Sequence, residues 1–323
     1  MNNDKTPVLM LAPMAGITDW PFRVLCRRQG ADELVTEMIS AMGLIQAPKS
    51  SRAYRQLLLT KPEEAPIIAQ LFGNDPGYLA RAAGQLSDTG IFSGIDLNVG
   101  CPAPKVTGSG SGAALMKDIP LSRLILAGMR KATSGRLSVK MRLGWDGDSR
   151  NYLDYALMCQ DMGADRVCVH ARTRTQQYSG KADWGAVAQV KRALRIPVVL
   201  NGDVFTPQDA VRALDETGAD GLAVGRGALG NPWLFGRIKR VLAGLPDSMP
   251  SPEEITDMAL IHLQLMARFK GDARAVIEMR KHLSWYLRGS PGAAQARTRI
   301  NTAGSLSELE GILRGHLLAQ TSG

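Results

Sequence analysis

The chain has 323 residues, of which 45% are hydrophobic and 21% are charged, enough for a large core and slightly more than a barrel of about 250 residues needs. We find no signal peptide and no apolar run near the roughly 18 residues of a membrane span, and therefore expect a cytoplasmic protein without a membrane anchor. The net charge of +9 favours a polyanionic partner, whereas four cysteines without a C-x-x-C pair and four histidines predict neither disulfides nor a metal site.

Short aliphatic runs recur along the first three quarters of the chain and predict eight strands. Most of the intervals between them have apolar residues at helical spacing, as at Trp184, Val187, Val190 and Leu194. Eight such units predict a parallel sheet closed into a (β/α)8 TIM barrel, and an open doubly wound sheet is the alternative. The predicted strands are residues 8–12, 34–36, 67–71, 95–98, 138–141, 166–170, 198–200 and 221–224.

A short internal repeat supports this pattern. The tripeptide Gly-Ala-Asp begins at Gly30, Gly163 and Gly218, each time after a helical stretch and just before an apolar strand. Glycine in that place is typical of a left-handed residue that ends a helix.

The last quarter of the chain has a different pattern. A short helix over residues 235–242 leads into a segment with three prolines, Pro246, Pro250 and Pro252, which is typical of a linker. Ser251 followed by Pro252 predicts the start of a new helix, and no strand pattern follows. We therefore predict a barrel domain over residues 1–243 and a smaller all-helical domain over residues 244–323.

Polar residues follow nearly every predicted strand, at the end where barrel enzymes have their active sites. Gln70, Lys140 and His170 each end an apolar run without an evident role in a turn, so solvated loops do not explain them. The run at residues 94–102 stops at Gly100-Cys101-Pro102, which holds a cysteine on a short rigid turn. This set predicts an enzyme, whereas Cys26, Cys159 and Cys168 are interpreted as buried structural thiols.

Two glycine turns after the seventh and eighth strands are suited to phosphate. They contain Asn201, Gly202 and Asp203, and then Gly225 and Arg226, which supply backbone N–H groups and a guanidinium. Residues 225–230 also match G-x-G-x-x-G, but no βαβ unit follows, so we reject a dinucleotide-binding fold. The glycine-rich run at residues 108–112 is either a further phosphate loop or a flexible connection.

Together these motifs closely resemble the tRNA-dihydrouridine synthases, which are flavoenzymes built on a TIM barrel. The last stretch resembles the helical domain of the bacterial B-type enzymes, although Ala171 stands where the family often has glycine. The matching stretches are residues 12–19 (APMAGITD), 97–106 (LNVGCPAPKV), 139–146 (VKMRLGWD), 170–174 (HARTR), 201–203 (NGD), 224–226 (VGR) and 280–287 (RKHLSWYL).

The resemblance implies FMN as a tightly bound cofactor, NADPH as reductant, and reduction of the C5=C6 bond of a uridine in tRNA. It implies Cys101 as the catalytic acid, with Asn98 and Arg142 facing the substrate. The cofactor would be bound by Pro13, Met14, Ala15, Gln70, Lys140, His170, Asn201, Gly202, Asp203, Gly225 and Arg226.

The chemistry of these residues agrees with that implication. Reduction of a uracil ring needs a hydride at C6, which a reduced flavin supplies, and a proton at C5. A cysteine side chain is mostly a protonated thiol near neutrality and can donate that proton. Lys140 would place a cation against the reduced flavin.

The helix expected over residues 274–288 has an apolar side and a basic side. Arg274, Lys281, Trp285 and Arg288 lie on the basic side, and an exposed tryptophan among cations suits stacking and phosphate contact with RNA. We assign Lys281, Trp285 and Arg288 to tRNA, whose target base must leave its stack to reach the barrel mouth. A solvated charged face is the alternative for this side.

Three other functions remain open. An FMN-dependent oxidoreductase of free pyrimidines, similar to a dihydroorotate dehydrogenase, would share the barrel but would not explain the basic helical domain. A barrel enzyme with Lys140 as a Schiff-base nucleophile would need no flavin, and an RNA-binding protein without activity would not need Cys101 and Lys140. We see no dimerisation segment and expect a monomer, and the sequence does not identify the uridine that is reduced.

Overall fold

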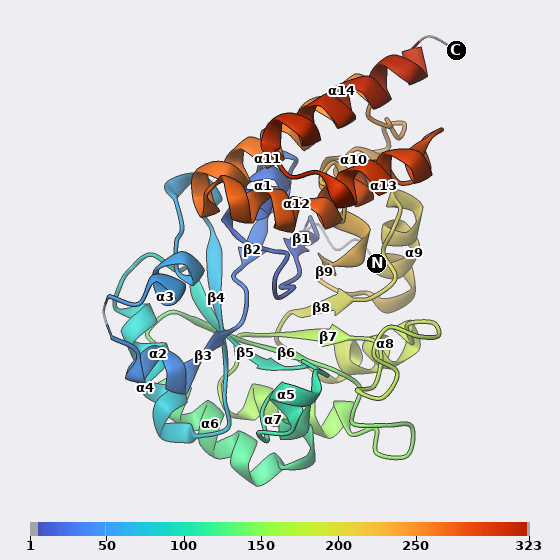
Figure 1. The fold of residues 1–323 in the computed structure, drawn as a ribbon. Helices are drawn as coiled ribbons and strands as arrows, with labels where there is room; N and C mark the ends of the chain where they lie inside the picture. The colour runs from blue at the N-terminus through green and yellow to red at the C-terminus, as the bar shows by residue number, and fades with distance from the viewer. Residues whose placement is uncertain (1–5, 49, 322–323) are drawn as a thin grey trace.

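A computed structural model describes residues 6–48 and 50–321, and its centre is a closed barrel of eight parallel strands (Figure 1). The ring closes where β2 pairs with β4, with Leu34 opposite Ile67. A further strand, β3, has only two residues and extends β4 at one edge. The strands are β1 (Val8–Leu11), β2 (Glu33–Val35), β3 (Ile39–Ser40), β4 (Ile67–Phe72), β5 (Gly94–Val99), β6 (Arg136–Met141), β7 (Arg166–His170), β8 (Val198–Asn201) and β9 (Gly221–Val224).

The predicted TIM barrel is therefore confirmed, and all eight predicted strands are present. The strands predicted at residues 166–170 and 221–224 coincide with β7 and β9 at both ends, and the others differ by one or two residues at an end. Only β3 has no counterpart in the prediction, because two residues are too few to show a period.

Helices cover the outside of the barrel and then continue beyond it (Figure 1). The α-helices are α1 (Trp20–Arg28), α2 (Ala41–Gln46), α3 (Arg52–Leu57), α4 (Pro76–Ser87), α5 (Pro104–Thr107), α6 (Ile119–Ala132), α7 (Tyr152–Asp161), α8 (Trp184–Ala193), α9 (Pro207–Thr217), α10 (Leu234–Leu242), α11 (Pro252–Lys270), α12 (Asp272–Tyr286), α13 (Ala293–Thr302) and α14 (Leu306–Thr321). Three short 3-10 turns are η1 (Pro62–Glu64), η2 (Gly112–Lys117) and η3 (Arg226–Ala228). No helix among the described residues is both long and apolar enough to span a membrane.

The Gly-Ala-Asp repeat has the same structure in all three copies. Gly30, Gly163 and Gly218 have φ values of 101°, 83° and 64°, the left-handed region that glycine favours. Each following aspartate accepts the backbone N–H of the first or second residue of the preceding barrel strand, through Leu9 to Asp32 (2.9 Å), Leu137 to Asp165 (2.8 Å) and Val198 to Asp220 (2.7 Å). The repeat thus ends a helix and fastens the start of one barrel strand to the next.

Alternation along the strands separates two apolar layers. Leu9, Leu11 and their equivalents on the other strands pack outward against the helices. The other set forms a smaller cluster of Met10, Ala12, Val35, Ile68, Cys168, Val199 and Ala223. Because successive side chains point to opposite faces, Gln70, Asn98, Lys140, His170 and Asn201 belong to the inward set, near the strand ends.

Helices α11 to α14 share a separate apolar core, to which α1 contributes Trp20, Val24 and Leu25. Helix α11 begins after Ser251, as the sequence predicted, and Ser251 and Glu254 form a capping box there. The predicted apolar side of α12 is buried, namely Val276, Met279, Leu283, Tyr286 and Leu287. Figure 1 shows these helices stacked at one end of the barrel, beside α1.

Candidate active site

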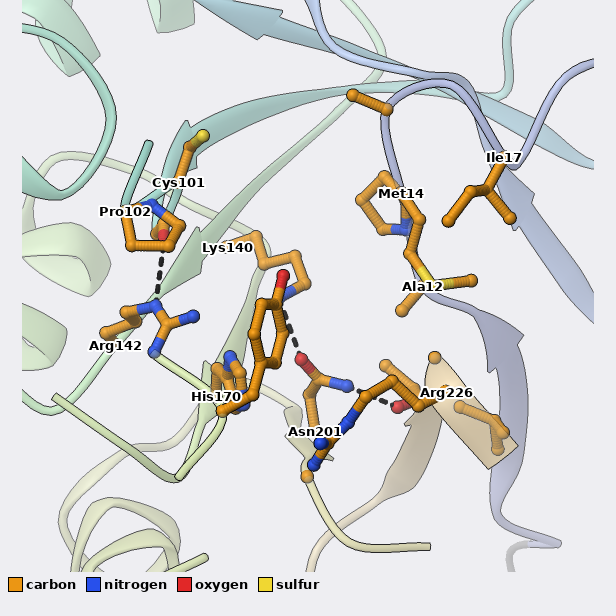
Figure 2. A pocket seen from close by; sticks show the side chains of 18 of the residues that line it. Ala12, Met14, Ile17, Cys101, Pro102, Lys140, Arg142, His170, Asn201 and Arg226 are labelled. Carbon is orange, nitrogen blue, oxygen red and sulfur yellow. Dashed lines mark hydrogen bonds between the residues drawn. The ribbon is translucent and has the colours of Figure 1, made fainter. Parts of the chain in front are cut away.

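A cavity of about 560 Å³ lies at the carboxyl ends of the barrel strands. Figure 2 shows Cys101 and Pro102 on one side of it, Met14 and Ile17 on the opposite side, and Lys140 and Asn201 between them. It is the size of a pocket that encloses a small ligand.

The cavity brings together every barrel residue that the sequence predicted for the site. All fourteen line it, although they come from seven different strands and loops: Pro13, Met14, Ala15, Gln70, Asn98, Cys101, Lys140, Arg142, His170, Asn201, Gly202, Asp203, Gly225 and Arg226. Lys281, Trp285 and Arg288 do not line it.

A chain of buried amides runs from the barrel interior to the cysteine turn. Asp96 accepts hydrogen bonds from Ser138 Oγ (2.6 Å) and from Gln70 Nε2 (2.8 Å). Gln70 Oε1 in turn accepts from Asn98 Nδ2 at 2.8 Å. Asn98 Oδ1 then accepts the backbone N–H of Cys101 at 2.9 Å. A carboxylate only accepts, so Asp96 determines which way both amide side chains face.

The turn that carries Cys101 is held from two further sides. Arg142 Nε donates to Gly100 O at 2.7 Å, and its Nη1 donates to two carbonyls of the loop after β7. Gly112 has a φ of 60°, and a side chain there would bring its Cβ within 2.9 Å of Cys101 O. One end of the glycine-rich run at residues 108–112 therefore packs against the cysteine turn, which explains its need for a residue without a side chain.

Lys140 and His170 form the polar floor of the cavity. Lys140 Nζ donates to Asn201 Oδ1 at 2.9 Å, and Asn201 Nδ2 donates to Ala223 O at 2.6 Å. Burial lowers the pKa of Lys140 below that of an exposed lysine. Burial, followed by the charge of Lys140, lowers the pKa of His170 far below its usual range, so the imidazole is neutral.

The loops after β8 and β9 meet at the other end of the cavity. Asp203 bonds to Arg172 Nη2 at 2.7 and 2.9 Å and to Arg226 Nη2 at 3.2 Å. Two guanidinium groups thus surround one carboxylate. A Cβ at Gly227 would lie 2.2 Å from Val204 O, so glycine lets these loops approach.

This end retains cationic donors that no protein group uses. Arg172 Nη1 is buried and has no acceptor among residues 6–48 and 50–321. It lies near Gly202, whose φ of 129° also favours glycine. The electrostatics of this end therefore suit an anion.

Sequence reasoning missed several residues that line the cavity, above all Tyr178. Its side chain is 53% exposed, and the guanidinium groups of Arg226 and Arg142 lie 5.2 and 5.8 Å from its ring. A lone tyrosine in a loop has no period, and only its position shortly after His170 could have drawn attention to it. The other missed lining residues include Ile17, Met38, Gln177, Phe205 and Leu229.

The basic side of α12 differs in part from the prediction. The expectation of an exposed Trp285 is wrong, because its half-buried ring packs edge-on against His282 at 5.1 Å. Lys281 Nζ donates to Gly16 O, in the loop whose Met14 and Ile17 line the cavity. Arg274 pairs with Glu278, whereas Arg288 is exposed and has no ion pair within the described part of the chain.

Comparison with known proteins gives consistent matches over almost the whole chain. Residues 10–320 match the family described as dihydrouridine synthase (Dus). A tRNA-dihydrouridine synthase B of Xanthomonas axonopodis pv. citri (strain 306) is 42% identical over 298 residues, which are 92% of this chain and 89% of that protein. The protein of the same name from Pseudomonas aeruginosa is 40% identical over 296 residues, 91% of this chain and 87% of that protein.

Solved structures show the same barrel at low sequence identity. A variant of NCR from Zymomonas mobilis superposes with a TM-score of 0.52 and 21% identity, covering 77% of this chain and 90% of that chain. A morphinone reductase mutant in complex with tetrahydroNAD gives 0.53 and 12%, covering 76% and 89%. These likenesses concern the fold.

Proposed function

Because the chain belongs to the dihydrouridine synthase family, we propose that it is a flavin-dependent tRNA-dihydrouridine synthase that uses FMN and NADPH to reduce the C5=C6 bond of a uridine in tRNA. The observation that carries the proposal is the convergence of Cys101, Lys140 and the Asp203–Arg226 pair on one cavity. A proton donor, a floor cation and an anion cradle are the three features that this chemistry needs.

The residues present fit an FMN molecule. At the end formed by Gly202, Gly225 and Arg226, free cationic donors and close loop packing suit the phosphate. Asp203 would act there by orienting Arg172 and Arg226, because its carboxylate is occupied by both guanidinium groups. Pro13, Met14 and Ala15 would line the ring, and Gln70, Lys140 and His170 would contact its polar groups. Asn201 was expected at the phosphate, but its amide bonds to Lys140 and Ala223, so it would act by positioning Lys140.

When bound, reduced FMN supplies the hydride for C6 of the uracil. Cys101 supplies the proton for C5 from its thiol, which lies on a turn fixed by Asn98, Arg142 and Gly112. Asn98 donates one Nδ2 hydrogen to Gln70 and accepts the backbone N–H of Cys101 through Oδ1. Its second Nδ2 hydrogen would therefore donate to the uracil. Lys140 and the neutral imidazole of His170 would lie beside the reacting ring at the polar floor of the cavity.

The substrate would approach across the helices that follow the barrel. Arg288 is free to bind a phosphate, and the edge of Trp285 offers a partly exposed aromatic surface. Lys281 would have two roles, because its ammonium group would contact RNA and also donates to Gly16 O in the cavity loop. Arg142 would contact the substrate only through Nη2, because its other nitrogens bind carbonyl groups.

The experiment is a map of dihydrouridine in tRNA from cells that lack the protein. We expect the modification to be lost at a defined uridine and restored by the wild-type chain, but poorly by Cys101→Ala. Cys168→Ala is the matched control, because that thiol lies in the apolar layer inside the barrel and should restore the modification fully.

Two results would contradict the proposal. An unchanged map in the deletion cells, together with purified protein that fails to modify an unmodified tRNA transcript, would exclude the assigned reaction. Turnover of free uracil or dihydroorotate without RNA would favour the pyrimidine oxidoreductase instead.

A further inference from the structure

A second pocket, of about 630 Å³, lies where the barrel helices meet the helices that follow the barrel. We call it the junction pocket. Its walls come from α1, from α3, from the segment before β4 and from the last turns of α11. It is lined by Trp20, Arg28, Arg52, Arg55, Gln56, Leu59, Lys61, Glu63, Leu265, Arg268 and Phe269.

The junction pocket has far more positive than negative charge. Five cations line it, and the only carboxylate, Glu63, is bonded to Arg28 at 3.0 Å. In the described residues the other four, Arg52, Arg55, Lys61 and Arg268, form no ion pair and all are exposed. Several unpaired cations around one pocket produce a positive local potential, which suits an anionic ligand.

The floor of the pocket is aromatic and well packed. Trp20 is 4% exposed, Phe269 lies against it at 5.8 Å, and Lys61 Nζ stands 4.0 Å above the indole ring. The indole Nε1 is buried without an acceptor in the described residues. Guanidinium groups above such a floor are suited to the phosphate groups of a nucleic-acid backbone.

The pocket is connected to the active-site cavity through neighbouring residues. Trp20 follows Asp19, Phe269 precedes Lys270, and Asp19 and Lys270 form a buried ion pair of 2.6 Å. Asp19 also ends the loop whose Met14 and Ile17 line the cavity. A ligand in the junction pocket thus lies one residue away from a structural link to the catalytic loop.

We propose that the junction pocket binds the phosphate backbone of the RNA substrate, at a place separate from the cavity that receives the target base. The proposal rests on the function assigned above in taking RNA as the ligand. The four unpaired cations come from three segments of the chain, namely α3, the stretch before β4 and α11, and this spread suits a chain of phosphates better than a single phosphate group. A dinucleotide such as NADPH also carries phosphate groups and is the alternative ligand.

The test reverses the charge of two residues of α3, as Arg52→Glu with Arg55→Glu. Both are exposed, and α3 has no buried residue, so the fold should tolerate the change. The matched control is Arg123→Glu with Lys131→Glu on α6, which changes the net charge equally on exposed residues that line neither pocket. The dissociation constant for an unmodified tRNA transcript is measured at several salt concentrations.

We expect the α3 variant to bind tRNA at least tenfold more weakly than the α6 control, and the slope of log Kd against log salt to fall by about 1.4 to 1.8, the value for two lost phosphate contacts. Arg268→Gln, on α11, should lower the slope by about half as much. The KM for NADPH should stay unchanged in all variants.

Equal tRNA affinity and slope in the α3 variant and the α6 control would overturn the proposal. A raised KM for NADPH with unchanged tRNA binding would also overturn it and identify a dinucleotide site. Binding is measured without turnover, so the two hypotheses fail separately. If the wild-type enzyme makes dihydrouridine but the α3 variant binds tRNA normally, only the junction-pocket site is refuted. If the α3 variant loses tRNA binding but the wild-type enzyme makes no dihydrouridine, only the assigned reaction is refuted.

Discussion

The barrel mouth and the helices that follow the barrel differ in how far their polar side chains are held by other protein groups. At the mouth, most polar side chains have defined partners, as in the bond from Lys140 Nζ to Asn201 and the bond from the backbone N–H of Cys101 to Asn98. On the basic side of α12 and around the junction pocket, cations such as Arg288 and Arg52 are exposed without ion pairs in the described residues. Hydrogen-bonded side chains hold reacting groups in position, whereas unpaired exposed cations can adjust to the phosphates of a polyanion.

The contrast has one exception, which joins the two regions. Lys281 belongs to α12 but donates to Gly16 O in the cavity loop, and Gly16 N donates to Glu37 Oε1 at 2.5 Å. A second link is formed by Lys270 at the end of α11, which makes ion pairs with Asp19 before α1 and with Glu278 of α12. The helices that would contact RNA therefore also hold the loop that would cover the cofactor.

Among the changes that compare the two regions, Lys140→Met at the mouth should have the largest effect. The change removes the floor cation and leaves Asn201 Oδ1 without its donor. We predict weaker retention of FMN and a loss of about 10²- to 10³-fold in turnover, as for other positioned donors, with tRNA affinity unchanged. Lys131→Met, at an exposed site of α6, should behave as wild type. Normal turnover in Lys140→Met would show that the mouth does not depend on fixed partners.

Acid should weaken the helices after the barrel, which bury the two neutral histidines His262 and His282, more than the mouth, which buries His170. Burial, aided by Lys270, lowers the pKa of His262 to about 3, and burial together with the charges of His262 and Lys281 lowers that of His282. Folded-state pKa values below the unfolded ones mean that the contribution of these groups is complete above about pH 6.5 and is lost as the pH falls. Below about pH 6.5 we predict a loss of about 1.4 kcal/mol per pH unit for each histidine in the free energy of unfolding, which is about 1.4 kcal/mol in total between pH 7.5 and 5.5.

Urea unfolding between pH 7.5 and 5.5 measures this effect. His282→Leu should reduce the pH dependence by the share of one histidine. A slope identical to that of the wild type would mean that His282 is protonated equally in the folded and unfolded states.

A smaller effect is expected from Asp96→Asn, behind the mouth. The new amide can donate as well as accept, so Gln70 and Asn98 lose their single orientation. We predict about a tenfold lower kcat, the cost of one positioned hydrogen bond, with an altered visible spectrum of bound flavin and an unchanged KM for tRNA. Ser138→Ala, which keeps the carboxylate, should cost less. An unaltered flavin spectrum in Asp96→Asn would argue against this role.

The smallest effects should separate Lys281 from Arg288. Arg288→Gln should weaken tRNA binding by a few fold and lower its salt slope by about 0.7 to 0.9, without effect on bound flavin. Lys281→Gln should also change the flavin spectrum, because it releases the loop at Gly16. If both variants behave alike, the link between the helices and the cavity loop has no consequence.

Much of the barrel could be predicted because its signals are local. Apolar runs and the Gly-Ala-Asp repeat mark the strands, and polar residues such as Gln70 and His170 mark the strand ends that barrel geometry brings together. What could not be predicted depends on juxtaposition. Trp285 was expected to be exposed because helical periodicity shows which side of α12 it occupies but not that His282 packs against it. The junction pocket combines residues about 200 positions apart, which no local pattern reveals.

The most direct test of the account is a single-turnover reaction. Enzyme loaded with FMN and reduced beforehand is mixed with unmodified tRNA, while flavin reoxidation and dihydrouridine are followed together. The wild type should produce one dihydrouridine per flavin oxidised, and Cys101→Ala should slow both signals by about 10²- to 10⁴-fold at unchanged tRNA affinity. Equal rates in the wild type and in Cys101→Ala would contradict the assignment of Cys101 as the proton donor, and with it the mechanism.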